Sequence, residues 1–219
     1  MVGGANMIEH IQCKNKVGYD IHEELIALLT YVSDLNNKLP FEITEKEYIK
    51  VRDNKDKYPK WVVGLVGFAA TFGAKYFGGY ARGFKADKVT PRNMTNEGIR
   101  NIEQQRVNLQ DIKFINGDFR EIDIKDGVIY ADPPYRGTTK YETELFPYDE
   151  FYKWCVDMSK DNIVLISEYN MPSDFECIWQ KEHKTSLGTG INVNSDKIRV
   201  EKLFIHKSRY LDIKCIIEI

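Results

Sequence analysis

Val128-Ile129-Tyr130-Ala131-Asp132-Pro133-Pro134-Tyr135 joins an apolar run to an acid, two prolines and an aromatic ring. The run predicts a short buried β-strand, Val128–Tyr130, that ends at Ala131-Asp132. Each proline fixes φ and lacks an N–H donor, so the loop is stiff and its carbonyl groups point outward unpaired. The sequence therefore predicts a rigid loop that holds a carboxylate and an aromatic ring at the end of a strand.

Strand-like and helix-like segments alternate on both sides of this loop. The expected strands cover residues 16–20, 112–115 and 162–167, and the expected helices cover residues 23–32, 93–109 and 148–158. Two later β segments, near residues 177–179 and 200–205, predict a closing hairpin. Strands that alternate with helices predict an α/β fold with a doubly wound, mainly parallel sheet.

Polar residues follow four of the expected strands, namely Asp20, Asp118, Asp132 and Ser167. In a doubly wound sheet, ligands bind beyond the carboxyl ends of the strands. Each of these residues, taken singly, is better explained as an ordinary turn residue. Four of them at the strand ends of one sheet favour a ligand site at that edge.

The loop that begins at Asp132 suits a planar amine. The Asp132 carboxylate and the Pro133 carbonyl can each accept one hydrogen of the amine, while Tyr135 stacks on the attached ring. Accepting both hydrogens turns the nitrogen lone pair out of the conjugated plane, so that it can attack a methyl group. The alternative is a Pro-Pro turn with an N-terminal Asp, which is common in loops. The position directly after a strand favours the catalytic interpretation.

Composition and charge narrow the class of protein. Hydrophobic residues make up 42% of the 219 residues and charged residues 29%, as in a globular domain, and no apolar run approaches the roughly 20 residues of a membrane span. Four scattered cysteines favour reduced thiols in a cytoplasm over a disulfide framework or a zinc site, and no metal site is expected.

Residues 50–100 hold eleven Lys and Arg against four Asp and Glu, a balance of +7 within a net charge of −2. This basic middle predicts a surface for a polyanion, with a solvated helical face as the equal alternative.

Several motifs together resemble a known family. They are Val2-Gly3-Gly4-Ala5-Asn6, Gly18-Tyr19-Asp20, Val66 to Tyr80, Gly117-Asp118-Phe119, the Asp132 loop and Ser167-Glu168-Tyr169-Asn170. The loop looks like motif IV of amino-group methyltransferases, and the wider pattern is similar to the Dam-like DNA adenine-N6 methyltransferases of phages and prophages. The resemblance implies a Rossmann-like S-adenosylmethionine-dependent methyltransferase fold. It implies a catalytic domain over residues 1–40 and 101–219 and an inserted helical DNA-recognition lobe over residues 41–100.

The resemblance also implies the residues that act. The catalytic loop would consist of Asp132, Pro133, Pro134 and Tyr135. The cofactor S-adenosylmethionine would be bound by Val2, Gly3 and Gly4 at its methionine part, by Asp20 at its ribose hydroxyls, by Asp118 at its adenine amine and by Phe119 at its adenine ring. The target base in double-stranded DNA would be flipped out, since N6 cannot be attacked in-line within the stack.

DNA contacts are expected from lobe residues Lys75, Tyr80, Arg82, Lys85, Lys88 and Arg92. Cations can meet phosphates, and aromatic rings can stack on bases or wedge between strands. The alternative, which we expect for most of the aromatic residues, is that they pack the core of the lobe itself. The resemblance further implies a restriction-modification setting in the cytoplasm of a bacterial or phage-infected cell.

The sequence departs from the family at its start. Family members have a glycine-lysine motif and a strand ending in Glu-Pro-Phe ahead of the glycine loop, whereas this sequence begins at Met1-Val2-Gly3-Gly4. We therefore expect weak S-adenosylmethionine binding, unless a homo-oligomer partner completes the sheet. The alternative function is a weakly active or inactive relative that binds DNA or a protein. Among enzymes, cytosine N4, RNA and a glutamine amide are the alternative methyl acceptors.

Overall fold

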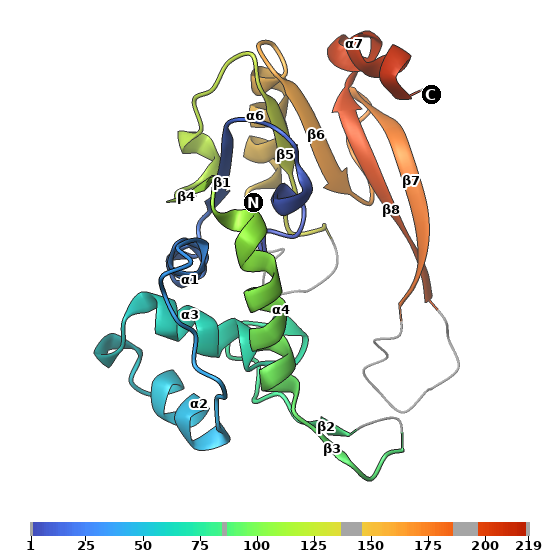
Figure 1. Cartoon of the computed structure of the whole chain (residues 1–219). Helices are drawn as coiled ribbons and strands as arrows, with labels where there is room; N and C mark the ends of the chain where they lie inside the picture. The colour runs from blue at the N-terminus through green and yellow to red at the C-terminus, as the bar shows by residue number, and fades with distance from the viewer. Residues whose placement is uncertain (1, 85–86, 137–145, 186–196, 218–219) are drawn as a thin grey trace. The chain divides into compact units, whose positions relative to one another are not determined.

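The computed structural model describes residues 2–84, 87–136, 146–185 and 197–217. The chain divides into two compact units, an N-terminal unit (Val2–Asp118) and a C-terminal unit (Phe119–Ile219). Each contains both helices and strands, so the fold is mixed α/β (Figure 1). The expected lobe over residues 41–100 stays a prediction. No helix in the described ranges is long and apolar enough to span a membrane.

Two parallel strands and several helices form the N-terminal unit. Its elements are β1 (Lys16–Asp20), α1 (Glu23–Ser33), α2 (Glu45–Arg52), α3 (Lys60–Ala69), β2 (Gly83–Phe84), β3 (Pro91–Arg92), α4 (Met94–Leu109) and β4 (Ile112–Asn116), with 3-10 turns at Ile8–His10, Lys55–Lys57 and Phe72–Ala74. Strands β1 and β4 pair in parallel, from Lys16 opposite Ile112 to Asp20 opposite Asn116. Both strands therefore end at the same edge. Strands β2 and β3 form a short antiparallel hairpin.

Helix α1 packs closely on α3 in the N-terminal unit. Its buried residues include Leu25, Leu28 and Leu29, which recur at helical spacing and face the core. A Cβ atom on Gly64 of α3 would lie 2.1 Å from the Glu24 carbonyl oxygen. Glycine at this position is therefore required for the two helices to approach so closely.

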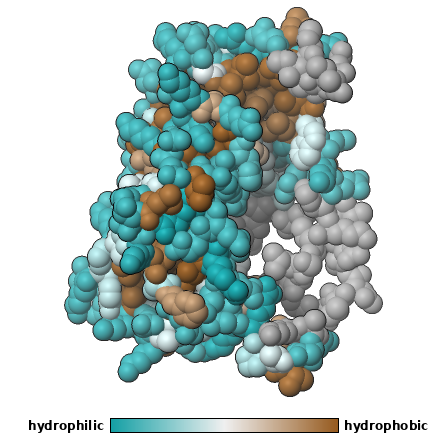
Figure 2. All heavy atoms as spheres, viewed as in Figure 1, coloured by the Kyte–Doolittle hydropathy of each residue, from teal (hydrophilic) through white to brown (hydrophobic). Residues whose placement is uncertain are grey.

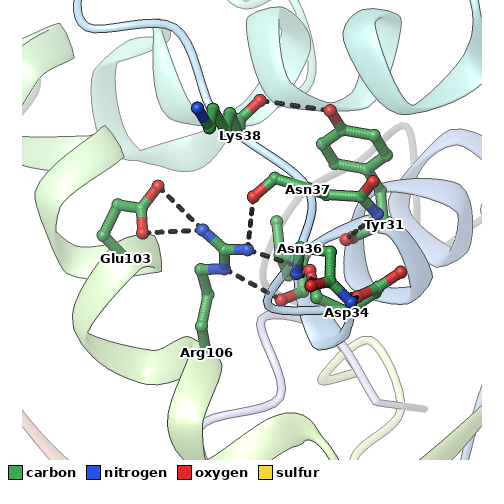
Figure 3. Close-up of polar contacts among 8 residues, drawn as sticks. Tyr31, Asp34, Asn36, Asn37, Lys38, Glu103 and Arg106 are labelled. Atoms are coloured by element: carbon green, nitrogen blue, oxygen red, sulfur yellow. Dashed lines mark hydrogen bonds and ion pairs between the residues drawn. The ribbon is translucent and has the colours of Figure 1, made fainter.

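Buried Arg106 of α4 binds the last turn of α1 and the loop that follows it. Its Nε donates to the Val32 carbonyl at 3.1 Å, and its second terminal nitrogen donates to the Asp34 and Asn37 carbonyls at 2.9 and 2.6 Å. The other terminal nitrogen lies 2.9 Å from a Glu103 carboxylate oxygen. Figure 3 shows the guanidinium turned toward Asp34, Asn37 and the Glu103 carboxylate. A buried charge is tolerated only with such partners, so Arg106 fixes α4 relative to α1.

One sheet of four strands forms the centre of the C-terminal unit. The elements are a 3-10 turn (Phe119–Glu121), β5 (Val128–Ala131), α6 (Tyr148–Met158), β6 (Ile163–Glu168), β7 (Phe175–Thr185), β8 (Lys197–His206) and α7 (Lys207–Ile217). The strand order is β5-β6-β8-β7. Strands β5 and β6 are parallel, whereas β8 is antiparallel to both of its neighbours. Phe151 and Cys155 of α6 share a buried apolar cluster with Ile129, Val164 and Ile166 of these strands.

The expected elements are largely confirmed, but their pairing differs from expectation. Helix α6 has the expected bounds, and β7 and β8 form the expected hairpin. A single, mainly parallel sheet was expected, yet the described residues form three separate sheets. Parallel pairing is limited there to β1 with β4 and β5 with β6. Strand β8 of the hairpin also pairs antiparallel with β6, which strand-helix alternation does not predict.

Candidate active site

Asp132 begins the loop that follows β5. Ile129 and Ala131 of that strand are buried, which fixes where the loop leaves the sheet. Pro133 is buried as well, whereas Asp132 is exposed. The expected placement of the acid directly after a buried strand is therefore confirmed.

Side chains of α6 and β6 hold the middle of this loop. The Tyr148 hydroxyl, in the first turn of α6, donates to the Pro134 carbonyl at 2.7 Å. The Tyr135 hydroxyl is hydrogen-bonded to the Ser167 hydroxyl of β6. The Tyr135 ring also meets the Tyr169 ring edge-on, with 4.7 Å between their centroids. Ser167, expected at a strand end, is thus a partner of the loop and lies in β6.

Glu168, the last residue of β6, binds Arg136, the residue directly after Tyr135. Its carboxylate accepts the backbone N–H of Arg136 at 3.1 Å and the backbone N–H of Tyr169 at 2.7 Å. The side chain is only 1% exposed. Burial raises its pKa, and the nearby charge of Asp132 raises it further, while the two backbone N–H groups lower it.

Electrostatics around Asp132 favour a proton acceptor. Although the residue as a whole is exposed, the protein atoms packed around its carboxyl group raise its pKa by desolvation. A hydrogen bond from Tyr135 opposes this rise, and the charge of Glu201 adds to it. Desolvation likewise raises the pKa of Tyr135, so its hydroxyl stays protonated at neutral pH. Asp132 is therefore more basic than an ordinary aspartate and remains an acceptor.

Asp20 and the glycine loop lie together in the N-terminal unit. Asp20 is the last residue of β1, is 7% exposed, and accepts the backbone N–H of Gly3 at 3.1 Å and that of His22 at 3.0 Å. The Val2 N–H donates to the Tyr19 carbonyl at 2.7 Å. Gly3 has a φ of 49°, and a Cβ atom there would meet nothing within 4 Å. The glycine loop, Val2-Gly3-Gly4, is therefore hydrogen-bonded to the carboxyl end of β1, and the space beside Gly3 is open.

Asp118 and Phe119 lie where the two units join in the chain. Asp118 comes two residues after β4, at the edge where β1 ends with Asp20. Phe119 opens the 3-10 turn of the C-terminal unit and meets the Phe146, Phe151 and Trp154 rings, with centroid distances of 6.0, 5.4 and 5.5 Å. Phe119 thus packs in its own apolar cluster, and its contact with a cofactor stays a prediction.

Three of the expected DNA contacts already have partners inside the N-terminal unit. The Tyr80 hydroxyl donates to the Ile43 carbonyl at 2.9 Å, and its ring lies edge-on to Tyr48. Arg82 forms an ion pair with Glu45, and the Arg92 Nε lies 2.8 and 2.9 Å from the two Glu97 carboxylate oxygens. These contacts favour structural roles for Tyr80, Arg82 and Arg92.

Two lysines of the same segment remain available. Lys75 and Lys88 are exposed, and neither forms an ion pair within the described part of the chain. Lys85 lies outside the described residues. Lys88 lies between β2 and β3, in a hairpin segment whose Phe84 and Val89 are 63% and 77% exposed. The hairpin therefore offers both a cation and apolar side chains to a partner.

Residues 2–155 match the family model of the D12 class N6 adenine-specific DNA methyltransferases, which covers more than half of the chain. The chain belongs to this family. It is an adenine-specific DNA methyltransferase, which transfers a methyl group from S-adenosylmethionine to adenine N6 in DNA. No curated protein matches the chain.

Two contacts of this methyltransferase were not expected from its sequence. Tyr148 was predicted only as the start of a helix, and Glu168 only as part of a motif shared with the family. A carboxylate at the end of the strand beside β5, one residue after Ser167, was the available signal for Glu168. The described ranges contain no cluster of three or more His, Cys, Asp or Glu side chains that could hold a metal ion.

Proposed function

We propose that the Asp132 loop binds the target adenine and directs its N6 amine at the methyl donor. The Asp132 carboxylate accepts one N6 hydrogen, the Pro133 carbonyl accepts the other, and Tyr135 stacks on the base. The hydrogen bonds that hold Pro134 and Tyr135 to α6 and β6 support this proposal. Acceptors that are fixed in advance cost no reorganisation when charge develops on the amine.

The chemistry needs orientation rather than a strong base. S-adenosylmethionine, when bound, supplies a methyl group on a positively charged sulfur. The N6 lone pair would form a bond to the methyl carbon, the carbon–sulfur bond would break with its electrons going to sulfur, and one N6 proton would leave afterwards. Asp132 polarises the amine and can take up that proton, because its pKa is raised above that of an ordinary aspartate.

For the N-terminal unit, the proposal is that Asp20 accepts both ribose hydroxyls of S-adenosylmethionine. A carboxylate has about four acceptor positions, so Asp20 can keep the N–H groups of Gly3 and His22 and still accept two hydroxyls. Val2, Gly3 and Gly4 follow the methionine part, and the open space beside Gly3 supports this. Asp118 accepts from the adenine amine, and Phe119 covers the ring.

The DNA substrate in this proposal is a duplex from which the target adenine is flipped. Residues 41–100 form the recognition lobe, with Lys75 and Lys88 meeting phosphates. Figure 2 shows apolar atoms at the tip of hairpin β2–β3, where Val89 is exposed. Apolar groups beside a cation suit a segment that presses on bases. In the same proposal, Lys85 also meets a DNA phosphate.

The wider setting is also proposed from the family. The two parallel strand pairs, β1 with β4 and β5 with β6, support a Rossmann-like methyltransferase fold. The enzyme would act in the cytoplasm of a bacterial or phage-infected cell, in a restriction-modification role. A homo-oligomer is the proposed form if one chain alone binds the cofactor weakly.

The observation that carries the catalytic proposal is the acid at the start of a loop held by α6 and β6. The test incubates the full chain with tritiated S-adenosylmethionine and unmethylated bacterial DNA, and then identifies the labelled nucleoside. We expect N6-methyldeoxyadenosine from the protein and none from Asp132→Ala. Asp174→Ala, which changes an exposed acid in the same unit, serves as the matched control and should retain activity. Label in deoxycytidine instead of deoxyadenosine would contradict the proposal.

Base flipping is tested once sequencing of the methylated DNA has located the target site. A duplex with 2-aminopurine at the target position should become more fluorescent on binding, because the flipped base leaves the stack. Tyr135→Ala should weaken binding of that duplex by about 1–3 kcal/mol if stacking is the contact that is lost. A fluorescence that does not change on saturated binding would argue against flipping.

A further inference from the structure

Pro134 and Tyr135 of the catalytic loop and the next residue, Arg136, are each held by a different side chain. Tyr148 binds the Pro134 carbonyl, Ser167 binds the Tyr135 hydroxyl, and Glu168 binds the next backbone N–H. The first two partners are neutral hydroxyl groups. The third is a carboxylate, which is a costly group to bury, and it lies 32 residues from its partner in the sequence.

The Glu168 carboxylate divides its two oxygens between two backbone donors. One oxygen accepts the Arg136 N–H at 3.1 Å and the other accepts the Tyr169 N–H at 2.7 Å. The side chain is 1% exposed, so water does not replace either acceptor. A glutamine has the same shape but offers one oxygen and an NH₂ group, so one of the two N–H donors would face another donor. Only a carboxylate therefore satisfies both.

We propose that Glu168 is a positioning residue for methyl transfer: it fixes Arg136, the residue directly after the catalytic loop, to β6 and thereby sets the direction of the Asp132 carboxylate. The inference rests on the proposed role of Asp132 and adds a residue that never touches the substrate. Adjacent parallel strands β5 and β6 carry the two acids, so the second strand supplies the support for the first.

Loss of Glu168 should affect the rate of methyl transfer and the affinity for the cofactor differently. Glu168 holds the loop in one conformation, so its loss should lower the rate of methyl transfer and leave affinity for S-adenosylmethionine nearly unchanged. A misplacement of about 1 Å at a reacting centre can cost on the order of a hundredfold in rate. We therefore expect Glu168→Gln to lower the single-turnover rate constant by about ten- to a hundredfold.

The experiment compares Glu168→Gln, Glu168→Asp and the matched control Glu182→Gln, which changes an exposed carboxylate on β7. With tritiated S-adenosylmethionine, the single-turnover rate constant of each full-length variant is measured with protein in excess over unmethylated DNA sites. The amplitude of the first turnover is measured separately, with the DNA sites in excess over protein. Cofactor affinity is measured by calorimetry on the same samples. Glu168→Asp keeps two carboxylate oxygens, so its rate constant should be several-fold higher than that of Glu168→Gln, and Glu182→Gln should match the unchanged protein.

The amplitude distinguishes positioning from folding. A variant that is merely less well folded loses amplitude and cofactor affinity but keeps the rate constant of its active fraction. Loss of amplitude and cofactor affinity with an unchanged rate constant would overturn the inference. So would a rate constant that is unchanged in every respect, or a Glu168→Asp variant that is no faster than Glu168→Gln. Asp132→Ala in the same assay tests the role on which the inference rests. If Asp132→Ala is as fast as the unchanged protein, the proposed role of the loop fails, whereas a slow Asp132→Ala beside a fast Glu168→Gln removes only the role of Glu168.

Discussion

Asp20 and Asp132 both stand at the carboxyl end of a parallel strand, yet their surroundings differ. Asp20 is buried, and its two oxygens are held by the backbone N–H groups of Gly3 and His22. Asp132 is exposed and is held through the side chain of Tyr135, while desolvation of its carboxyl group raises its pKa. Backbone donors cannot rotate away, so Asp20 is a fixed acceptor that suits binding. Asp132 keeps open acceptor positions, which suits a group that takes part in the reaction.

Removing the exposed acid should have the largest effect. Asp132→Ala should lower the single-turnover rate of methyl transfer by about a hundredfold or more, because a fixed electrostatic group at the reacting nitrogen is lost. Affinity for S-adenosylmethionine and the thermal unfolding temperature should stay close to those of the unchanged protein, since an exposed side chain is removed. Turnover within a few-fold of normal would show that the two acids do not differ in this way.

Removing the buried acid should change binding instead. Asp20→Ala deletes the acceptor of two backbone N–H groups and of the proposed ribose hydroxyls. One hydrogen bond to a charged group is worth about 1.5–3 kcal/mol, so the loss of even one of the two proposed bonds should lower affinity for S-adenosylmethionine by roughly tenfold to a hundredfold. Calorimetric titration measures this loss.

A graded variant shows whether charge or shape matters at Asp20. Asp20→Asn keeps one acceptor oxygen and should fall between the unchanged protein and Asp20→Ala in cofactor affinity. With saturating cofactor, the methyl-transfer rate of Asp20→Asn should recover. A rate that stays low at saturation would mean that Asp20 acts in the reaction itself and that the contrast with Asp132 is wrong.

The pH dependence of the rate tests the raised pKa of Asp132. The carboxylate accepts a hydrogen only when ionised, so activity is retained above its pKa and is lost as the pH falls through it. Because desolvation raises this pKa, the loss should begin at a higher pH than the ordinary aspartate value of about 3.9 allows, and should approach tenfold per pH unit. Tyr135→Phe removes the hydrogen bond that lowers the pKa, so the loss should move to still higher pH. Identical single-turnover pH profiles for the two proteins would contradict this account.

The sequence predicts elements better than pairings, and the reason is physical. The apolar spacing of α6 is local, and the helix is found over Tyr148–Met158 as expected. The hairpin of β7 and β8 is also set by neighbouring segments. A single parallel sheet, in contrast, depends on contacts between segments far apart in the chain. No local pattern determines those contacts.

The same limit applies to the candidate site. The position of Asp132 after β5 was predictable, because a strand and a Pro-Pro loop are adjacent in sequence. The Glu168 contact joins residues 32 positions apart, and the Arg82 ion pair joins residues 37 apart. Composition alone could not distinguish Arg82, which already has an acid beside it, from Lys75, which is exposed. The roles of the cofactor and DNA residues stay predictions.

The smallest effect is expected from the exposed lysines of the N-terminal unit. Lys75→Gln combined with Lys88→Gln removes two cations that have no ion pair in the described ranges. Each phosphate contact contributes about 0.9 to the slope of log affinity against log salt, so the slope for duplex binding should fall by about 2. Lys113→Gln with Lys181→Gln, which neutralises two exposed lysines outside residues 41–100, is the matched control and should leave the slope unchanged.

Fluorescence anisotropy of a labelled duplex across a salt series measures the salt dependence of binding for the unchanged protein and both double variants. Neither lysine is near the two strand-end acids in sequence, so the single-turnover rate at saturating DNA should be unaffected. Equal slopes for both double variants would mean that the duplex is bound by other cations, and that the basic balance of residues 50–100 faces solvent.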